Sequence, residues 1–216
     1  MTSIAAITLE VDDRAAADQF YATAFGLGSQ LRLRAAEGPT AGFRGFSLAL
    51  TVSQPADVVR LVDGALAAGA VSLKPVAKSF WGYGGVVQAP DGAIWKVATS
   101  AKKDTGPATG TIDEKVLLLG VEDVKATKRF YVEQGLTVAK SFGGKYAEFT
   151  ADSPDQFKLA LYKRAALAKE VGVADDGSGS HRIALTSSAA TAFTDLDGYS
   201  WEASSLASAR PASDQG

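Results

Sequence analysis

Two charged side chains occupy equivalent positions in a motif that the chain contains twice. Each copy has an Asp-Gly turn, two further residues, a tryptophan and then a charged residue, Lys96 in the first copy and Glu202 in the second. A pseudo-two-fold relation between the copies predicts that Lys96 and Glu202 meet. Such a pair has two alternative roles. It is either a structural ion pair, or an anchor for a polar or anionic ligand that can also act as a general acid and base.

A second repeated motif indicates that the duplication covers most of the chain. Leu9–Asp13 leads into Phe20-Tyr21 and a Gly-Leu pair, and Leu119–Asp123 leads into Phe130-Tyr131 and another Gly-Leu pair. Both motifs recur after roughly a hundred residues, which is the length of one duplicated unit. We expect a first unit over residues 1–101, a linker over 102–114, a second unit over 115–205 and a tail over 206–216.

Hydrophobic periodicity and turn residues predict the elements of each unit. The first unit should contain a strand over 4–11, a helix over 14–25 capped by Asp12 or Asp13, strands over 30–34 and 43–53, a helix over 55–69, and a closing hairpin over 86–99. The second should contain a strand over 115–121, a helix over 123–134, strands over 136–140, 145–150 and 157–162, a short helical turn over 165–172 and a strand over 181–185.

The second unit lacks a counterpart of the helix that begins at Pro55, since no segment after Ser187 corresponds to it. The sheet around residues 181–185 should therefore be covered by another part of the chain or by a partner chain. We expect that region to be either a dimer contact or the most labile part of the protein. His181 is the single histidine of the chain, and a lone histidine is more often structural than a ligand.

These repeated features resemble the vicinal-oxygen-chelate superfamily, which includes glyoxalase I, bleomycin-resistance proteins and extradiol dioxygenases. The resemblance rests on a strand ending in Val-x-Asp, a helix containing Phe-Tyr, a Gly-Leu exit and a closing Asp-Gly hairpin, each present twice. It implies an α+β fold in which two βαβββ units form a cupped mixed β-sheet with the helices on the outside. It leaves the function open, because one fold hosts many activities.

The resemblance also implies where a metal site would lie. Metal-dependent members take ligands from four inward positions, which fall here on Ala6, Lys96, Val116 and Glu202. A divalent ion needs three or more oxygen or nitrogen donors, and Glu202 is the single donor in this set. The resemblance therefore predicts no metal site and no cofactor. Alternation along the first strand places Thr8 and Glu10 on the same inward face.

A second candidate feature is the segment over 78–85, which combines three aromatic residues, Phe80, Trp81 and Tyr83, with three glycines. The glycine spacing does not match a dinucleotide- or phosphate-binding loop. The segment is either an aromatic plug over a sheet edge or a lid that stacks on a flat organic ligand. Tyr146, with Phe142, could supply a counterpart from the second unit.

Composition narrows the classes of function. The chain has 216 residues, 46% of them hydrophobic, a formal net charge of −2 and no cysteine, which together indicate a globular protein without disulfides or thiolate chemistry. The absence of a clustered basic patch disfavours nucleic acid as a partner. No apolar run approaches about 18 residues and no signal sequence is evident, so we expect a cytoplasmic protein without a membrane span, either a monomer or a homodimer.

These observations favour a metal-independent small-molecule-binding protein of the glyoxalase/bleomycin-resistance type, with an aromatic or anionic ligand. The alternative is a glyoxalase-like lyase or isomerase in which Lys96 and Glu202 transfer protons. A scaffold without a ligand is a third class.

Overall fold

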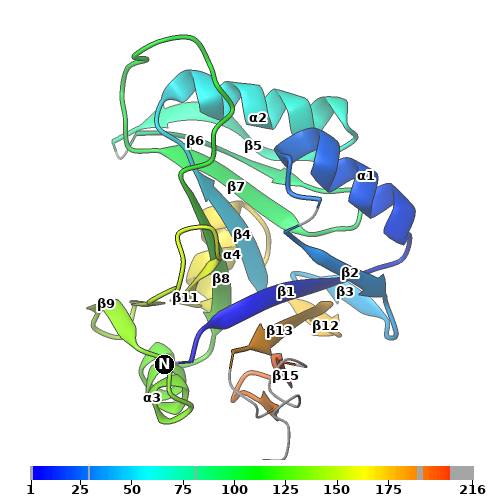
Figure 1. Cartoon of the computed structure of the whole chain (residues 1–216), viewed down its shortest axis with the longest axis vertical. Helices are drawn as coiled ribbons and strands as arrows, with labels where there is room; N and C mark the ends of the chain where they lie inside the picture. The colour runs from blue at the N-terminus through cyan, green and yellow to red at the C-terminus, as the bar shows by residue number, and fades with distance from the viewer. Residues whose placement is uncertain (1, 29, 81, 189–191, 205–216) are drawn as a thin grey trace, which may run out of the picture.

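The computed structural model describes residues 2–28, 30–80, 82–188 and 192–204. This part of the chain has the predicted α+β architecture, with four helices and mixed β-sheets (Figure 1). The helices are α1 (Arg14–Phe25), α2 (Pro55–Ala67), α3 (Val124–Glu133) and α4 (Arg164–Val171). None of them is long and apolar enough to cross a membrane.

The larger sheet has eight strands in the order β5-β6-β7-β4-β8-β11-β10-β9. Its strands are β4 (Phe46–Thr51), β5 (Val71–Ser79), β6 (Gly82–Gln88), β7 (Ile94–Thr99), β8 (Glu114–Val121), β9 (Val138–Phe142), β10 (Tyr146–Phe149) and β11 (Lys158–Lys163). The βαβββ motif occurs twice in it, as β4–α2–β5–β6–β7 and as β8–α3–β9–β10–β11. In each motif the first and last strands pair in parallel, and the two motifs join through the antiparallel pair β4–β8.

The smaller sheet has five strands in the order β14-β15-β13-β1-β2. Its strands are β1 (Ile4–Val11), β2 (Arg32–Ala35), β13 (Ile183–Ser187), β14 (Phe193–Thr194) and β15 (Ser200–Ala203). The short strands β3 (Thr40–Gly42) and β12 (Gly177–Gly179) pair with each other. Both large sheets combine strands from the two halves of the chain. Each βαβββ motif lies within one half, over residues 46–99 and 114–163, and covers only part of the repeated unit.

One continuous hydrophobic core joins both sheets to α1, α2 and α3. Trp95 on β7 and Trp201 on β15 are fully buried in it. Tyr21 on α1 packs against Trp95, and Tyr131 on α3 packs against Trp201, with ring centroids 5.4 and 5.3 Å apart. In both halves, a helix therefore packs against the tryptophan that follows the Asp-Gly turn.

The ends of α1 follow the predicted capping signals. Asp13 accepts hydrogen bonds from the backbone N–H groups of Ala15 and Ala16, at 2.9 and 3.0 Å, which satisfies two amides of the first turn. Gly26 ends the helix in the left-handed conformation, with φ of 68°. Asp123 caps α3 in the same way as Asp13 caps α1.

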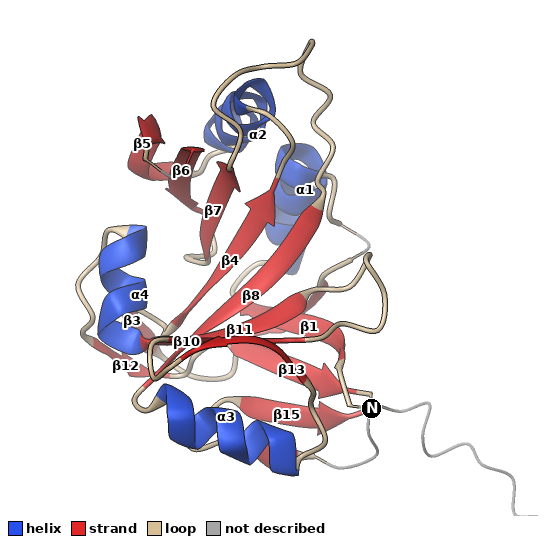
Figure 2. Cartoon of the chain, turned by 90° about the vertical axis from the view of Figure 1, so that its left-hand side faces the viewer, coloured by secondary structure: helices blue, strands red, loops and turns tan. Residues whose placement is uncertain are grey.

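Helix α4 differs in its location from the other three helices. It packs on β4, β8 and β11, and its buried residues Leu167, Ala168 and Val171 form a second, smaller core with Val86 and Ile94. Val86 and Ile94 alternate along their strands with Val87 and Trp95 of the main core, so α4 lies on the opposite face of the sheet. Figure 2 shows α4 and α1 on opposite sides of β4 and β8. The expectation of outside helices thus holds for α1–α3, while α4 covers the inner face.

The described part of the second half has no counterpart of α2, as expected, and the five residues 188–192 between β13 and β14 are too few for a helix of that length. Of the two expected kinds of cover, the structure shows the one within the chain. Strand β13 lies between β1 and β15, and all five of its residues are buried. The region is therefore covered within the chain and does not depend on a partner for its burial.

The segment between β7 and β8 is held against α2. Gln54 Oε1 accepts hydrogen bonds from the N–H groups of Thr105 and Gly106. The buried carboxylate of Asp57 accepts from the N–H groups of Thr109 and Gly110, both at 2.6 Å. Burial raises the pKa of Asp57, but hydrogen bonds from Gly110, Gln54 and Thr109 outweigh it, so the pKa lies below its ordinary value.

Candidate functional site

A cavity of about 580 Å³ lies on the inner face of the eight-stranded sheet, next to α4. Strands β4, β5, β6 and β7 supply its floor and one wall, and Glu170 on the last turn of α4 supplies the facing wall. A cavity of this size fits a small organic molecule, since ligand pockets typically measure about 300–1,000 Å³.

Small side chains keep the floor of this pocket open. Gly84 on β6 and Ala98 on β7 are paired neighbours, and a Cβ atom added to Gly84 would lie 3.4 Å from the Cβ atom of Ala98. Larger residues at these two positions would fill the space. Gly82 has a different role, because its φ of +131° and a carbonyl oxygen 1.9 Å from any added Cβ exclude a side chain.

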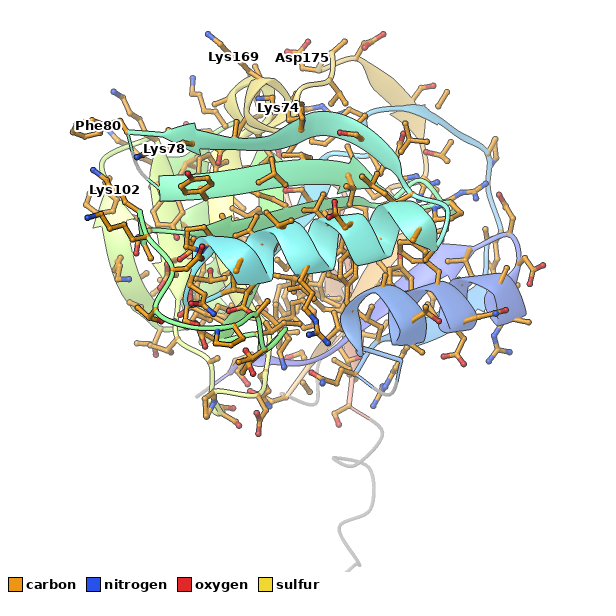
Figure 3. All side chains as sticks on the ribbon, turned by 90° about the horizontal axis from the view of Figure 1, so that it is seen from above. Lys74, Lys78, Phe80, Lys102, Lys169 and Asp175 are labelled. Carbon is orange, nitrogen blue, oxygen red and sulfur yellow. The ribbon has the colours of Figure 1, made fainter. Side chains whose placement is uncertain are left out.

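Charged groups line the wall beside α4. Lys96 on β7 forms an ion pair with the Glu170 carboxylate. The Lys74 ammonium on β5 donates to the backbone carbonyls of Lys169 and Glu170, at 2.9 and 2.5 Å, at the end of α4. Figure 3 shows Lys74 next to α4, with Lys78 at the other end of the same strand. Three lysines and one carboxylate thus line the pocket, which gives it an excess of positive charge.

The described aromatic residues of the segment over 78–85 lie in different surroundings. Tyr83 lines the pocket and also packs against the main core. Phe80 is 78% exposed and does not line the pocket; its ring lies 5.4 Å from the Lys102 ammonium (Figure 3). Trp81 lies outside the described residues. The predicted lid therefore has no support from Phe80, whose ring packs beside Lys102.

Tyr146 lies on the other half of the inner face and does not reach the pocket. Its hydroxyl donates to Glu148 at 2.5 Å, and its ring contacts Phe142 and Tyr162. Burial, followed by the hydrogen bond to Glu148, raises the pKa of Tyr146. Burial, followed by the Glu170 charge, raises the pKa of Tyr162. Both hydroxyls are therefore neutral hydrogen-bond donors at physiological pH.

A second polar cluster lies on the five-stranded sheet, centred on Arg34. Its guanidinium donates twice to Glu10, at 3.1 and 2.6 Å, and once to Glu202. The hydrogen bonds to Glu10 and then Glu202 raise the pKa of Arg34. Thr8 lies beside Glu10 on the same face of β1 and is buried.

This cluster does not fit a divalent metal ion. Two carboxylates are present, but both already accept hydrogen bonds from the Arg34 guanidinium, whose positive charge repels a metal ion. Among the described residues, no group of three or more histidine, aspartate or glutamate side chains could hold a metal ion. The donor set is thus too small for the geometry that such ions require.

The structure corrects the predicted Lys96–Glu202 pair. Lys96 contacts Glu170, and Glu202 contacts Arg34. The physical reason is strand pairing: β7 is the parallel partner of β4 in one sheet, whereas β15 is the parallel partner of β13 in the other. Proton transfer shared between Lys96 and Glu202 therefore has no geometric basis.

The four positions carried over from metal-dependent proteins also separate into two pairs. Lys96 and Val116 lie in one row of the eight-stranded sheet, with Ala49 between them. Ala6 and Glu202 lie in one row of the five-stranded sheet, with Thr186 between them. The four side chains do not converge on one point.

Sequence reasoning missed Lys74, Lys78, Glu170 and Arg34. Lys74 and Lys78 lie on β5, which was not predicted because Pro75 interrupts its alternation. Proline is tolerated there because β5 is an edge strand. Arg34 lies on a predicted strand, in register with Glu10, and that register was the available signal. No local signal points to Glu170, whose contact with Lys96 depends on the position of α4.

His181 is a structural residue. Its ring stacks on Tyr199 at a centroid distance of 4.2 Å. Its two ring nitrogens lie 2.6 Å from the Arg44 carbonyl oxygen and 3.1 Å from that of Asp197. The histidine therefore braces two loops that precede β4 and β15.

The sequence matches no family model and no curated protein, but the fold resembles solved structures. Glyoxalase I from Zea mays superposes with a TM-score of 0.58 at 13% identity, covering 93% of this chain and 91% of that chain. A mutant of the same enzyme gives 0.59 at 14% identity, with 94% and 92% covered. A putative dioxygenase from Bacillus subtilis subsp. subtilis str. 168 gives 0.51 at 13% identity, with 85% and 69% covered. At these identities the likeness establishes the fold.

Proposed function

The chain has the fold of the vicinal-oxygen-chelate superfamily, and we propose that it binds a small organic molecule in the pocket between β4–β7 and α4, without a metal ion. The observation that carries the proposal is the pocket itself, with its volume of about 580 Å³ and an open floor at Gly84 and Ala98. Its walls combine apolar side chains with a few charged groups, the composition typical of ligand sites.

The arrangement supports binding better than catalysis. The lysine and glutamate near the pocket, Lys96 and Glu170, are paired with each other. Tyr162, which contacts α4, carries a raised pKa. The pocket offers shape, apolar contact and charge, which suffice for recognition.

The proposal is tested with N-phenyl-1-naphthylamine, a neutral fluorescent probe that brightens in apolar sites. The expected result is saturable binding of one probe per chain. Ala98→Trp, which fills the floor, should abolish it, and Ala67→Trp, which adds the same bulk at an exposed position on α2, should not. If Ala98→Trp folds and binds the probe like the natural protein, the pocket is not the site.

The metal-independence of binding is tested separately. Treatment with EDTA should leave both the probe affinity and the melting temperature unchanged, and elemental analysis should find no stoichiometric transition metal. A loss of binding on chelation that added Zn²⁺ or Mn²⁺ restores would contradict this part of the proposal.

A further inference from the structure

We propose that the pocket takes an organic anion, and that the acid group of this ligand displaces the Glu170 carboxylate from Lys96. The inference rests on the proposed function, since it concerns the same pocket. It adds the chemical class of the ligand and assigns Glu170 as an internal competitor for the cation that binds it.

The charge balance of the pocket favours an anion. Lys74, Lys78 and Lys96 line it together with a single carboxylate, that of Glu170. Lys96 is the cation that this carboxylate neutralises. Lys78 forms no ion pair within the described part of the chain. An incoming carboxylate, sulfonate or phosphate would therefore meet uncompensated positive charge.

The Lys96 side chain is held in place by the sheet around it. It lies on β7, a strand in the interior of the sheet, in register with Ala49 and Val86. Its side chain is 32% exposed, so most of its stem is packed and its ammonium faces the pocket. Fixing the stem reduces the entropy that a flexible lysine would lose on binding.

Glu170 can release Lys96 without displacing α4. The backbone of the last turn of α4 is held by Lys74, which donates to the carbonyls of residues 169 and 170. Leu167, Ala168 and Val171 of the same helix are buried in the second core. The Glu170 side chain itself is 35% exposed. Exchange of its carboxylate for that of a ligand therefore costs one solvent-accessible ion pair and no core packing.

The test compares two probes that share one ring system: neutral N-phenyl-1-naphthylamine and its sulfonated analogue, 8-anilino-1-naphthalenesulfonate. The natural protein should bind the sulfonate more tightly, and this preference should weaken as salt is added. Glu170→Gln should strengthen sulfonate binding about threefold to fivefold, the range of a solvent-accessible ion pair, and leave the neutral probe unchanged. Lys96→Met should remove the preference for the sulfonate.

The matched control is Glu114→Gln. Glu114 forms an ion pair with Lys158 on the same sheet, at a similar exposure, so this variant changes the net charge equally but outside the pocket. The inference is overturned if Glu114→Gln strengthens sulfonate binding as much as Glu170→Gln, or if the natural protein binds both probes equally. In either case the proposed function survives, provided that Ala98→Trp still blocks the neutral probe. Circular dichroism in the near ultraviolet checks that each variant is folded, since the sulfonate also binds loosened states.

Discussion

Removing the Arg34 guanidinium should destabilise the fold far more than removing its neighbour Arg32. Both side chains lie on β2 and face the same side of the five-stranded sheet. Arg34 donates to Glu10 and Glu202, whereas Arg32 is exposed and makes one long contact to Thr186, at 3.5 Å. Methionine retains the apolar stem of either arginine and removes the charge, so Arg32→Met is the matched control for Arg34→Met.

The magnitude follows from the burial of the two carboxylates. The Glu10 side chain is 13% exposed, and a hydrogen bond to such a charged, shielded group is worth about 1.5–3 kcal/mol. The Glu202 side chain is 39% exposed and that of Arg34 is 40% exposed, so solvent screening limits their contact to less than about 1 kcal/mol. We expect Arg34→Met to cost about 2–3 kcal/mol and Arg32→Met less than about 0.5 kcal/mol.

Urea unfolding measures both variants, and an unchanged m-value shows that the denatured state is comparable. Double-mutant cycles then locate the energy. The Arg34–Glu10 coupling should reach about 1–2 kcal/mol and the Arg34–Glu202 coupling should stay below about 1 kcal/mol, while Lys96 and Glu202 should show none. Equal costs for Arg34→Met and Arg32→Met, or a measurable Lys96–Glu202 coupling, would refute the described pairing.

Two buried aspartates should respond to pH in opposite directions. The lowered pKa of Asp57 means that its contribution to stability is present above its ordinary value and is lost as the pH falls below about 4, through the lowered value. Asp57→Asn should therefore reduce the loss of stability at acid pH, and an unchanged loss would contradict this. Burial raises the pKa of Asp195 despite hydrogen bonds from Tyr131, Tyr199 and Asp197. Its contribution is therefore present at low pH and lost as the pH rises through the raised value, so Asp195→Asn should gain stability relative to the natural protein between about pH 4 and neutrality. A pH-independent difference between these two proteins would show that Asp195 does not titrate in this range.

Local signals predicted most of the elements. The range of α1 was predicted from Arg14 to Phe25, as it is in the structure, because Asp13 and Gly26 supply its start and stop within the sequence itself. The strand β5 was missed, since its proline breaks the alternation that identifies a strand, although the helical turn predicted over 165–172 matches α4 to within one residue. The pocket was not predicted, because no local pattern places α4 beside β5. Its walls come from segments with weak local preference whose position depends on packing.

The Lys96–Glu202 error shows what a duplicated sequence can and cannot specify. Equivalence in a repeat predicts equivalent local surroundings, and the two residues do share them: each follows an Asp-Gly turn and a buried tryptophan on the last strand of its half. Contact requires in addition that both residues lie next to the interface between the halves. The strands at this interface are β4 and β8 in one sheet and β1 and β13 in the other. Strands β7 and β15, which carry Lys96 and Glu202, each lie one strand further from it. Lys96 therefore pairs with Glu170 on the connecting helix α4, and Glu202 pairs with Arg34 on the edge strand β2. Because those partners are not themselves equivalent in the repeat, the two halves could acquire different chemistry, a pocket on one sheet and a closed ion cluster on the other.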